Sequence, residues 1–299
     1  MGYSISTNKY MEALQSVRNS FTANNKKIAM LYSGGKDSTA VLLAIAKEFP
    51  EAQLYLYALN NGCMYPEEVK GKIVEKLDLF RDRGLVKNKI EAIYFDMREM
   101  MAYLGFRTFS DDMARYPTGL LCCSCKLIMH FITARYSQQI GVSKIADGYS
   151  YFERFLPEQT LEFRSVVEGP IAEKYGVKMI SPLYSVFDGL DAPMQIISGF
   201  GLDPKTFLGE NQGQGVCMLG MLYTIPYDVN NSDEPTNQFF TAMKKAVVEY
   251  TSDKPRFISG RKTQQLIMHD SYGNERLADI PYDQLMDKII AAKEIFFEN

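Results

Sequence analysis

The sequence predicts an α/β protein with an open parallel sheet and helices on both of its faces. Short apolar segments alternate with segments of helical periodicity up to about residue 186, which is typical of parallel strands joined by helical crossovers. A turn with adjacent glycines follows the first apolar segment and precedes a helical one. We expect an N-terminal helix over 1–26, an α/β domain over 27–186, and a mainly helical C-terminal region over 187–299 that completes the functional site.

Five segments have the composition of buried strands. The first is a short apolar run that ends at glycines, and the second ends in the turn signal Asn-Asn-Gly. A proline lies near the end of the fifth. The predicted strands cover residues 27–33, 52–62, 89–97, 142–150 and 176–186.

Helical segments lie between and after these strands. The first carries Met11, Leu14, Val17 and Phe21 on one stripe. The third begins with proline and acidic residues and ends in glycine, which are both helix-end signals. The predicted helices cover 8–22, 37–49, 66–84, 125–141, 192–201, 234–251 and 281–297, whereas 105–121 is irregular.

Composition narrows the class of protein. The 299 residues are 46% hydrophobic and carry a net charge of −3, so a sizeable core is expected and a long nucleic-acid footprint is disfavoured. No stretch approaches the roughly 20 apolar residues of a membrane span, and no signal peptide is visible. We expect a cytoplasmic protein whose five cysteines are reduced, so that their grouping indicates metal binding or catalysis.

The turn SGGKDS (33–38) has residue types that suit a phosphate and a divalent cation. Two glycines let backbone N–H groups approach a ligand, and the helix that follows offers free N–H groups and the positive end of its dipole. Lys36 adds a positive charge, and Asp37 suits a cation that bridges it to an anion. The turn is not a Walker loop, because G-x-x-x-x-G-K-[ST] is absent.

SGGKDS resembles the pyrophosphate-binding loop of the N-type ATP pyrophosphatases, or PP-loop proteins, which have the adenine nucleotide alpha-hydrolase fold. The resemblance implies that 27–186 is a PP-loop domain that uses ATP and Mg²⁺. It implies cleavage of ATP between the α and β phosphates, transfer of AMP to a substrate oxygen, and displacement of AMP by a nucleophile. The implied ATP-binding residues are Tyr32, Ser33, Gly34, Gly35, Lys36, Asp37, Ser38, Thr39, Leu59, Asn60, Asn61 and Gly148.

The cysteines bear on which nucleophile displaces AMP. Cys122 and Cys125 form a C-x-x-C, and Cys217 lies far along the chain in a glycine-rich segment. Three thiolates suit an iron–sulfur cluster or zinc and leave one iron of a 4Fe–4S cluster open. Cys123 is an alternative ligand or a persulfide carrier. We predict that Cys122, Cys125 and Cys217 converge beside the ATP site and are catalytic with Lys36 and Asp37.

This cysteine pattern is similar to that of the iron–sulfur tRNA thiolation enzymes and, in motif order, of the LarE-like sulfur transferases. Where tRNA-modifying relatives often carry GHxxDD, this chain has DGYSYFE (147–153), so only Asp147 and Glu153 remain to join Asp37 as carboxylate ligands of magnesium. The terminal zinc-binding cysteine pairs and an RNA-binding extension are absent from the sequence.

Other polar residues carry weaker signals. Lys126 is expected to open a helix, where a cation suggests a bound anion, and Arg154 follows Glu153; both are weak substrate-binding candidates. Cys63, His130 and His269 are expected to be structural. The basic segment 253–262 is expected to be a solvated face rather than an RNA contact.

We expect an adenylating sulfur transferase that thiolates a nucleobase, free or in tRNA, or a small cofactor precursor. A sulfur donor protein and a homodimer are compatible with the sequence, tRNA is disfavoured by charge, and no membrane partner is expected. One alternative is a PP-loop amidotransferase or nitrile-forming ligase that uses ammonia, similar to 7-cyano-7-deazaguanine synthase. A second is a nucleotide-binding subunit without catalysis.

Overall fold

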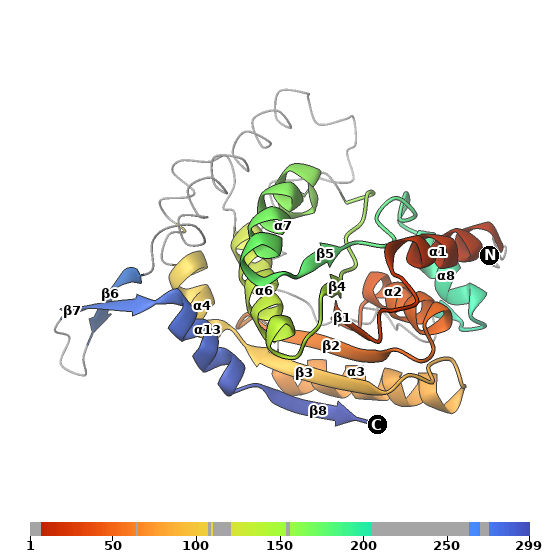
Figure 1. The fold of residues 1–299 in the computed structure, drawn as a ribbon, viewed down its shortest axis with the longest axis horizontal. Coiled ribbons are helices and arrows are strands. Elements are labelled where there is room, and N and C mark those ends of the chain that lie inside the picture. The colour runs from red at the N-terminus through yellow and green to blue at the C-terminus, as the bar shows by residue number, and fades with distance from the viewer. Residues whose placement is uncertain are drawn as a thin grey trace.

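Six strands form one sheet in the computed structural model, in the order β5-β4-β1-β2-β3-β8 (Figure 1). Five of these strands are parallel, and β8 is antiparallel to β3. A separate antiparallel pair joins β6 and β7. The predicted fold class is therefore confirmed. The structure describes residues 7–63, 65–106, 109, 121–153, 156–204, 263–269 and 275–299.

The strands at the centre of the sheet agree with the sequence prediction, whereas β4 and β5, at one edge, are shorter than predicted. They are β1 (Lys27–Leu31), β2 (Gln53–Asn60), β3 (Ile90–Asp96), β4 (Lys144–Ala146), β5 (Lys178–Ile180), β6 (Thr263–His269), β7 (Glu275–Pro281) and β8 (Glu294–Glu298). The strands predicted at 142–150 and 176–186 each contain only three residues. The regular ladder stops at Asp147, whose carboxylate accepts a bond from the Tyr149 backbone. Pro182, two residues after β5, has no N–H to donate.

The helices are α1 (Thr7–Ser20), α2 (Lys36–Glu48), α3 (Pro66–Asp82), α4 (Arg98–Met101), α6 (Leu121–Gln139), α7 (Leu161–Tyr175), α8 (Ala192–Gly199) and α13 (Tyr282–Ala291). A π-helical turn η1 (Ala102–Phe106) follows α4, and a 3-10 turn η2 (Pro157–Gln159) precedes α7. The helix predicted at 234–251 lies outside the described residues.

Helix α7 was not predicted, because Gly169 and Pro170 interrupt its sequence pattern. Its ends are nevertheless well specified. The Thr160 side chain accepts a hydrogen bond from the Phe163 backbone at 3.1 Å, and Gly176 ends the helix in the left-handed conformation. These end contacts and the packing of α7 against α6 outweigh the cost of the two unfavourable residues.

The chain end differs from the prediction. A helix was expected over 281–297, but α13 ends at Ala291 and the apolar residues that follow form β8 along the outer edge of β3 (Figure 1). Ile295 and two phenylalanines favour a strand, and β3 offers unpaired backbone groups there. The prediction of a helix is therefore wrong after Ala291.

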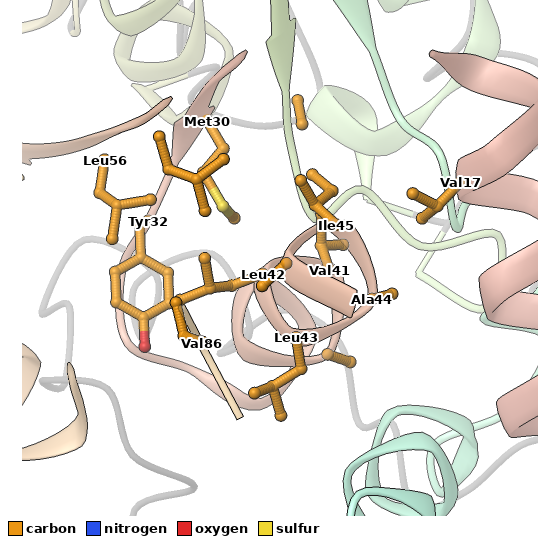
Figure 2. Packing of buried hydrophobic residues seen from close by; sticks show 14 of the residues in the cluster. Val17, Met30, Tyr32, Val41, Leu42, Leu43, Ala44, Ile45, Leu56 and Val86 are labelled. Atoms are coloured by element: carbon orange, nitrogen blue, oxygen red, sulfur yellow. The ribbon is translucent and has the colours of Figure 1, made fainter. Parts of the chain in front are cut away.

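Two apolar cores lie on opposite faces of the sheet. One core joins alternate strand residues to α1, α2, α3 and α8, and the other joins the remaining strand residues to α6, α7 and α13. Figure 2 shows the first core, where Met30 and Tyr32 of the β1 segment pack with Val41, Leu42 and Ile45 of α2. This packing fixes the start of α2 against the end of β1, which positions the turn between them.

Candidate active site at the carboxyl edge of the sheet

The strand order gives the sheet a topological switch point between β1 and β4. The chain passes from β1 to β2 on one side, whereas β4 lies on the other side of β1. The loops that follow these two strands therefore leave in opposite directions, and ligands of open α/β sheets bind at such switch points. The SGGKDS turn follows β1, and Asp147-Gly148 follows β4. The sequence placed the turn at this edge, and the structure agrees.

The SGGKDS turn has the geometry of an anion-binding loop. Gly34 has a positive φ of 74°, a conformation that favours glycine. Gly35 caps α2 without a side-chain hydrogen bond, so no cap side chain occupies the helix N-terminus. The Ser33 hydroxyl accepts from the Gly35 backbone at 3.3 Å, and the Ser38 hydroxyl donates to the Gly35 carbonyl at 3.2 Å. Lys36 is only 8% exposed, so its charge is held within the turn.

Lys76 supports this turn and was not predicted from the sequence. Its ammonium group on α3 donates to the Gly34 carbonyl and is buried. Burial lowers the pKa of Lys76 to about 8. The sequence did carry an indication that Lys76 is buried, because Lys76 falls on the apolar stripe of α3 that includes Ile73 and Phe80.

Two residues of the predicted ATP-binding set have side chains that are buried in the protein core. Thr39 and Tyr32 are both buried, and their hydroxyl groups lie 3.5 Å apart. The Thr39 hydroxyl thus lies beside the Tyr32 hydroxyl in the core, and its role as a donor to a phosphate stays a prediction. The backbone of Tyr32 remains at the carboxyl end of β1.

The loop after β4 lies directly against the start of α2. A Cβ atom on Gly148 would come within 3.1 Å of the Ser38 nitrogen and 3.3 Å of the Asp37 Cβ. Any side chain at Gly148 would thus press on the first turn of α2. The predicted ATP-site residue Gly148 and the SGGKDS turn are brought together by this approach.

Asp37 and Asp147 lie at this junction with carboxyl groups that are costly to ionise. Burial raises the pKa of each to about 6, and Glu153 raises the pKa of Asp37 further. One Asp147 oxygen accepts from the Ser181 hydroxyl and the Tyr149 backbone. Its other oxygen is buried and, among the described residues, has no hydrogen-bond partner. That oxygen is suited to a cation.

A polar cluster extends the site beyond this junction, with three buried members and two half-buried cations. We call its residues, Lys126, His130, Tyr149, Glu158 and Arg164, the Tyr149 cluster. The Lys126 ammonium lies 4.7 Å and the Arg164 guanidinium 5.4 Å from the centre of the Tyr149 ring. The Tyr149 hydroxyl lies 3.3 Å from His130 Nε2. Burial raises the pKa of Glu158 to about 7 and lowers that of His130 to about 3, so His130 is neutral.

The sequence identified only part of the Tyr149 cluster. Tyr149, Glu158 and Arg164 have no local motif and meet only through tertiary contacts. Lys126 was expected to open a helix, but α6 begins at Leu121, so Lys126 lies in its second turn and the argument from the helix start is wrong. The apolar Leu121 extends α6 backwards because it is buried in the core. The structural interpretation of His130 fits its burial.

The C-x-x-C lies at the start of α6, near the carboxyl end of β2. Cys123 and Cys125 are buried and Cys122 is half-buried. The Asn61 side-chain amide, just after β2, donates to Cys125 Sγ at 3.5 Å. The helix was predicted to begin at Cys125, but α6 begins at Leu121. Cys125 nevertheless lies at the sheet edge. Cys63 packs against the adjacent core, in keeping with a structural role.

The convergence of the cysteines and the metal sites stay predictions. Cys217, Arg154 and the segment 253–262 lie outside the described residues, and His269 lies in β6. Within the described ranges, no group of three or more Cys, His, Asp or Glu residues could hold a metal ion by itself. Asp37, Asp147 and Glu153 therefore form no complete magnesium site, nor do the α6 cysteines form a complete cluster site. Leu59 and Asn60 end β2 as expected.

None of the described helices combines the length and apolar composition that crossing a membrane requires.

No protein-family model and no curated protein matches the chain.

Solved structures with a similar fold include U34-tRNA thiolase NcsA from Methanococcus maripaludis with its 4Fe–4S cluster. That protein is 16% identical to this chain, and the match has a TM-score of 0.42 and covers 82% of this chain and 79% of that one. A 4-thiouridine synthetase in complex with RNA and ATP is 14% identical, with a TM-score of 0.45 over 76% of this chain and 53% of that chain.

A third similar structure is a predicted subunit of tRNA methyltransferase from Methanocaldococcus jannaschii. It is 19% identical, with a TM-score of 0.40 over 57% of this chain and 75% of that one. The likeness to all three concerns the fold. At these values it identifies no activity.

Proposed function

We propose that this protein is an ATP-dependent sulfur transferase that adenylates a substrate carbonyl oxygen and then replaces AMP with sulfur. One observation carries the proposal: the Asn61–Cys125 contact brings the C-x-x-C to the same sheet edge as the SGGKDS turn. A phosphate-binding turn alone would suit any use of ATP. A cysteine pair at the same edge adds a nucleophile suited to displacing AMP.

ATP is the substrate that the SGGKDS turn would bind. The free N–H groups of α2 and the buried Lys36 charge would hold its β and γ phosphates. Asp37 fits Mg²⁺, as does the Asp147 oxygen that no described residue contacts, with the phosphates as further ligands. Mg²⁺ would neutralise charge on the leaving pyrophosphate. The backbone from Leu59 to Asn61 would meet the adenosine.

The proposed chemistry has two displacements. The substrate oxygen attacks the α-phosphorus, and the bond to pyrophosphate breaks. Sulfur then attacks the activated carbon, AMP leaves with the oxygen, and a thiocarbonyl or thiol product forms. Lys36 and the α2 dipole stabilise the negative charge that develops in the first step.

The cysteines offer two ways to carry sulfur. The thiols of Cys122 and Cys125, with Cys217, suit a 4Fe–4S cluster that would supply an open iron for sulfur. Without a cluster, a sulfur donor protein transfers sulfane sulfur to one cysteine as a persulfide, which attacks the activated carbon and releases AMP. A second cysteine then attacks the resulting disulfide to release the product thiol, and a thiol reductant reduces the cysteine disulfide that remains. The acidic chain favours a nucleobase, nucleotide or other small substrate over tRNA.

Serine substitutions test the proposal. Anaerobically purified protein would receive ATP, Mg²⁺ and a thiol reductant, with sulfide or a protein persulfide as the sulfur source. The acceptor would be either unmodified tRNA or a mixture of free nucleobases and nucleotides. We expect Cys122→Ser, Cys125→Ser and Cys217→Ser to lose thiolated product, measured by mass spectrometry, while AMP formation stays within about twofold. Cys63→Ser is the matched control and should keep both activities. Undiminished thiolation in the three variants would contradict the proposal, and a nitrogen-containing product with ammonia would indicate a ligase.

A further inference from the structure

Lys76 of α3 holds one peptide group of the SGGKDS turn from outside the turn. Its ammonium group donates a hydrogen bond to the Gly34 carbonyl, and the residue is only 7% exposed. The backbone of Lys76 is held in place, because Ile73 and Phe80 anchor the same helix in the apolar core. The turn is thus tied to a packed helix that lies 42 residues further along the chain.

The peptide group between Gly34 and Gly35 has little intrinsic preference for one orientation. Neither residue has a Cβ atom, so the steric barriers that normally oppose rotation of a peptide group are absent on both of its sides. Gly34 already has a positive φ of 74°. Rotation of this peptide group by half a turn would exchange the positions of its carbonyl oxygen and its N–H, so an external contact has to select one orientation.

The hydrogen bond from Lys76 selects the orientation in which the N–H is available to an anion. In a trans peptide the carbonyl and the N–H point in opposite directions, so a Gly34 carbonyl held towards α3 directs the Gly35 N–H away from α3. That N–H donates to the Ser33 hydroxyl at 3.3 Å. The bond is longer than the ordinary range of about 2.7–3.2 Å, so a phosphate oxygen would be a better acceptor.

Lys76 also brings a positive charge to the turn. Burial and the nearby Lys72 lower the pKa of Lys76 to about 8, while Glu75 raises it, so most Lys76 side chains are charged at pH 7. An ionised donor makes a stronger hydrogen bond than a neutral one. The bond from Lys76 is therefore well suited to hold the peptide group in one orientation.

We propose that Lys76 is a positioning residue that keeps the Gly35 N–H, and not the Gly34 carbonyl oxygen, directed at the pyrophosphate part of ATP. The inference rests on the proposed binding of ATP at this turn. It adds a residue of α3 that acts through the peptide group and not by touching the phosphates. Lys76 differs in this from Lys36, whose charge lies within the turn itself.

The orientation of this peptide group can be followed by itself, because Gly34-Gly35 is the one Gly-Gly pair in the sequence. In full-length protein labelled with 1-¹³C,¹⁵N-glycine, a nuclear magnetic resonance spectrum that correlates each amide with the preceding carbonyl carbon gives a single peak, from this peptide group. The spectrum would be recorded at pH 7 without ligand. Calorimetric titration with pyrophosphate and Mg²⁺ would then measure anion binding.

The variants separate the hydrogen bond from the general charge of α3. Lys76→Met keeps most of the side-chain length without the donor or the charge. Lys72→Met is the matched control, because it removes an equal charge one turn earlier on the same helix, from a side chain that pairs with Glu68. Lys76→Leu decides the matter if Lys76→Met does not fold, and circular dichroism establishes folding.

We expect Lys76→Met to move the Gly34 carbonyl and Gly35 amide resonances and to weaken pyrophosphate binding by about tenfold or more. Lys72→Met should leave the peak in place and the affinity within about twofold, as for an exposed charge. An unmoved peak or an unchanged affinity in folded Lys76→Met, or an equal loss in Lys72→Met, would overturn the role of Lys76 alone. Failure of the unaltered protein to bind pyrophosphate would contradict the proposed ATP site as well.

Discussion

Three carboxyl groups of the candidate site and the adjoining Tyr149 cluster are held where ionisation is unfavourable. Burial raises the pKa of Asp37 and Asp147 to about 6 and that of Glu158 to about 7. Strongly perturbed acids gathered in one region are typical of functional sites. Folding places them there at a cost in stability, which a bound cation or a positively charged ligand group would offset.

Glu158 gives a pH prediction at the scale of one residue. Its pKa in the folded state lies above the ordinary value of 4.5, so the folded protein favours the protonated form. The resulting destabilisation is absent below pH 4.5, develops as the pH rises to about 7, and is complete above it. The difference corresponds to at most about 3 kcal/mol at 1.36 kcal/mol per unit.

Glu158→Gln should therefore raise the free energy of unfolding by roughly 1–3 kcal/mol at pH 8 and leave it nearly unchanged at pH 4.5. Urea unfolding of the nucleotide-free protein at the two pH values measures this difference. Glu173→Gln, at an exposed position of α7, is the control and should change neither value appreciably. Equal effects at both pH values would show that Glu158 does not titrate as described.

At the scale of elements, β8 completes the sheet by covering β3. It pairs with β3 in antiparallel register from Glu91–Glu298 to Tyr94–Glu294. Glu294 also contacts the Lys70 ammonium of α3 at 3.0 Å, and the Phe297 ring lies 5.7 Å from the Arg81 guanidinium. An uncovered β3 would present free backbone groups to other chains.

Deleting residues 294–299 should lower the melting temperature by several degrees and cause concentration-dependent association. Thermal unfolding and size-exclusion chromatography at several protein concentrations would measure both effects. Glu298→Ala changes an exposed side chain and keeps the strand backbone, so it should behave like the unaltered protein. A monomeric deletion variant with an unchanged melting temperature would show that β8 contributes nothing to the edge.

The elements that could be predicted are those with a strong local pattern. The strand-turn-helix unit around SGGKDS carries its own apolar periodicity and helix-start residues, so it was located correctly. Helix α7 contains Gly169 and Pro170, and β8 is specified by its pairing with β3, so neither was visible locally. The same holds within the site: the turn is contiguous, whereas Lys76, Glu158 and Arg164 reach it only after folding.

At the scale of the whole molecule, the order of the strands determines which residues meet at the candidate site. Placing β4 beside β1 brings Asp147 and Gly148 onto the first turn of α2, although more than 100 residues separate the two loops. Placing β2 on the other side of β1 brings Asn61 and the contacted Cys125 to the same edge. One sheet edge thus gathers the SGGKDS turn, the carboxyl groups of Asp37 and Asp147, and a thiol.

The most direct test of the account is whether the protein cleaves ATP to AMP and pyrophosphate at the SGGKDS turn. Both products would be measured with Mg²⁺ and the mixed substrates, using the unaltered protein, Lys36→Met and Lys47→Met. Methionine keeps most of the lysine length without its charge, and Lys47 is an exposed control on the same helix. We predict AMP and pyrophosphate from the unaltered protein and Lys47→Met, and a loss of at least about 100-fold in folded Lys36→Met. Undiminished pyrophosphate release by Lys36→Met, or formation of ADP and phosphate instead, would contradict the account.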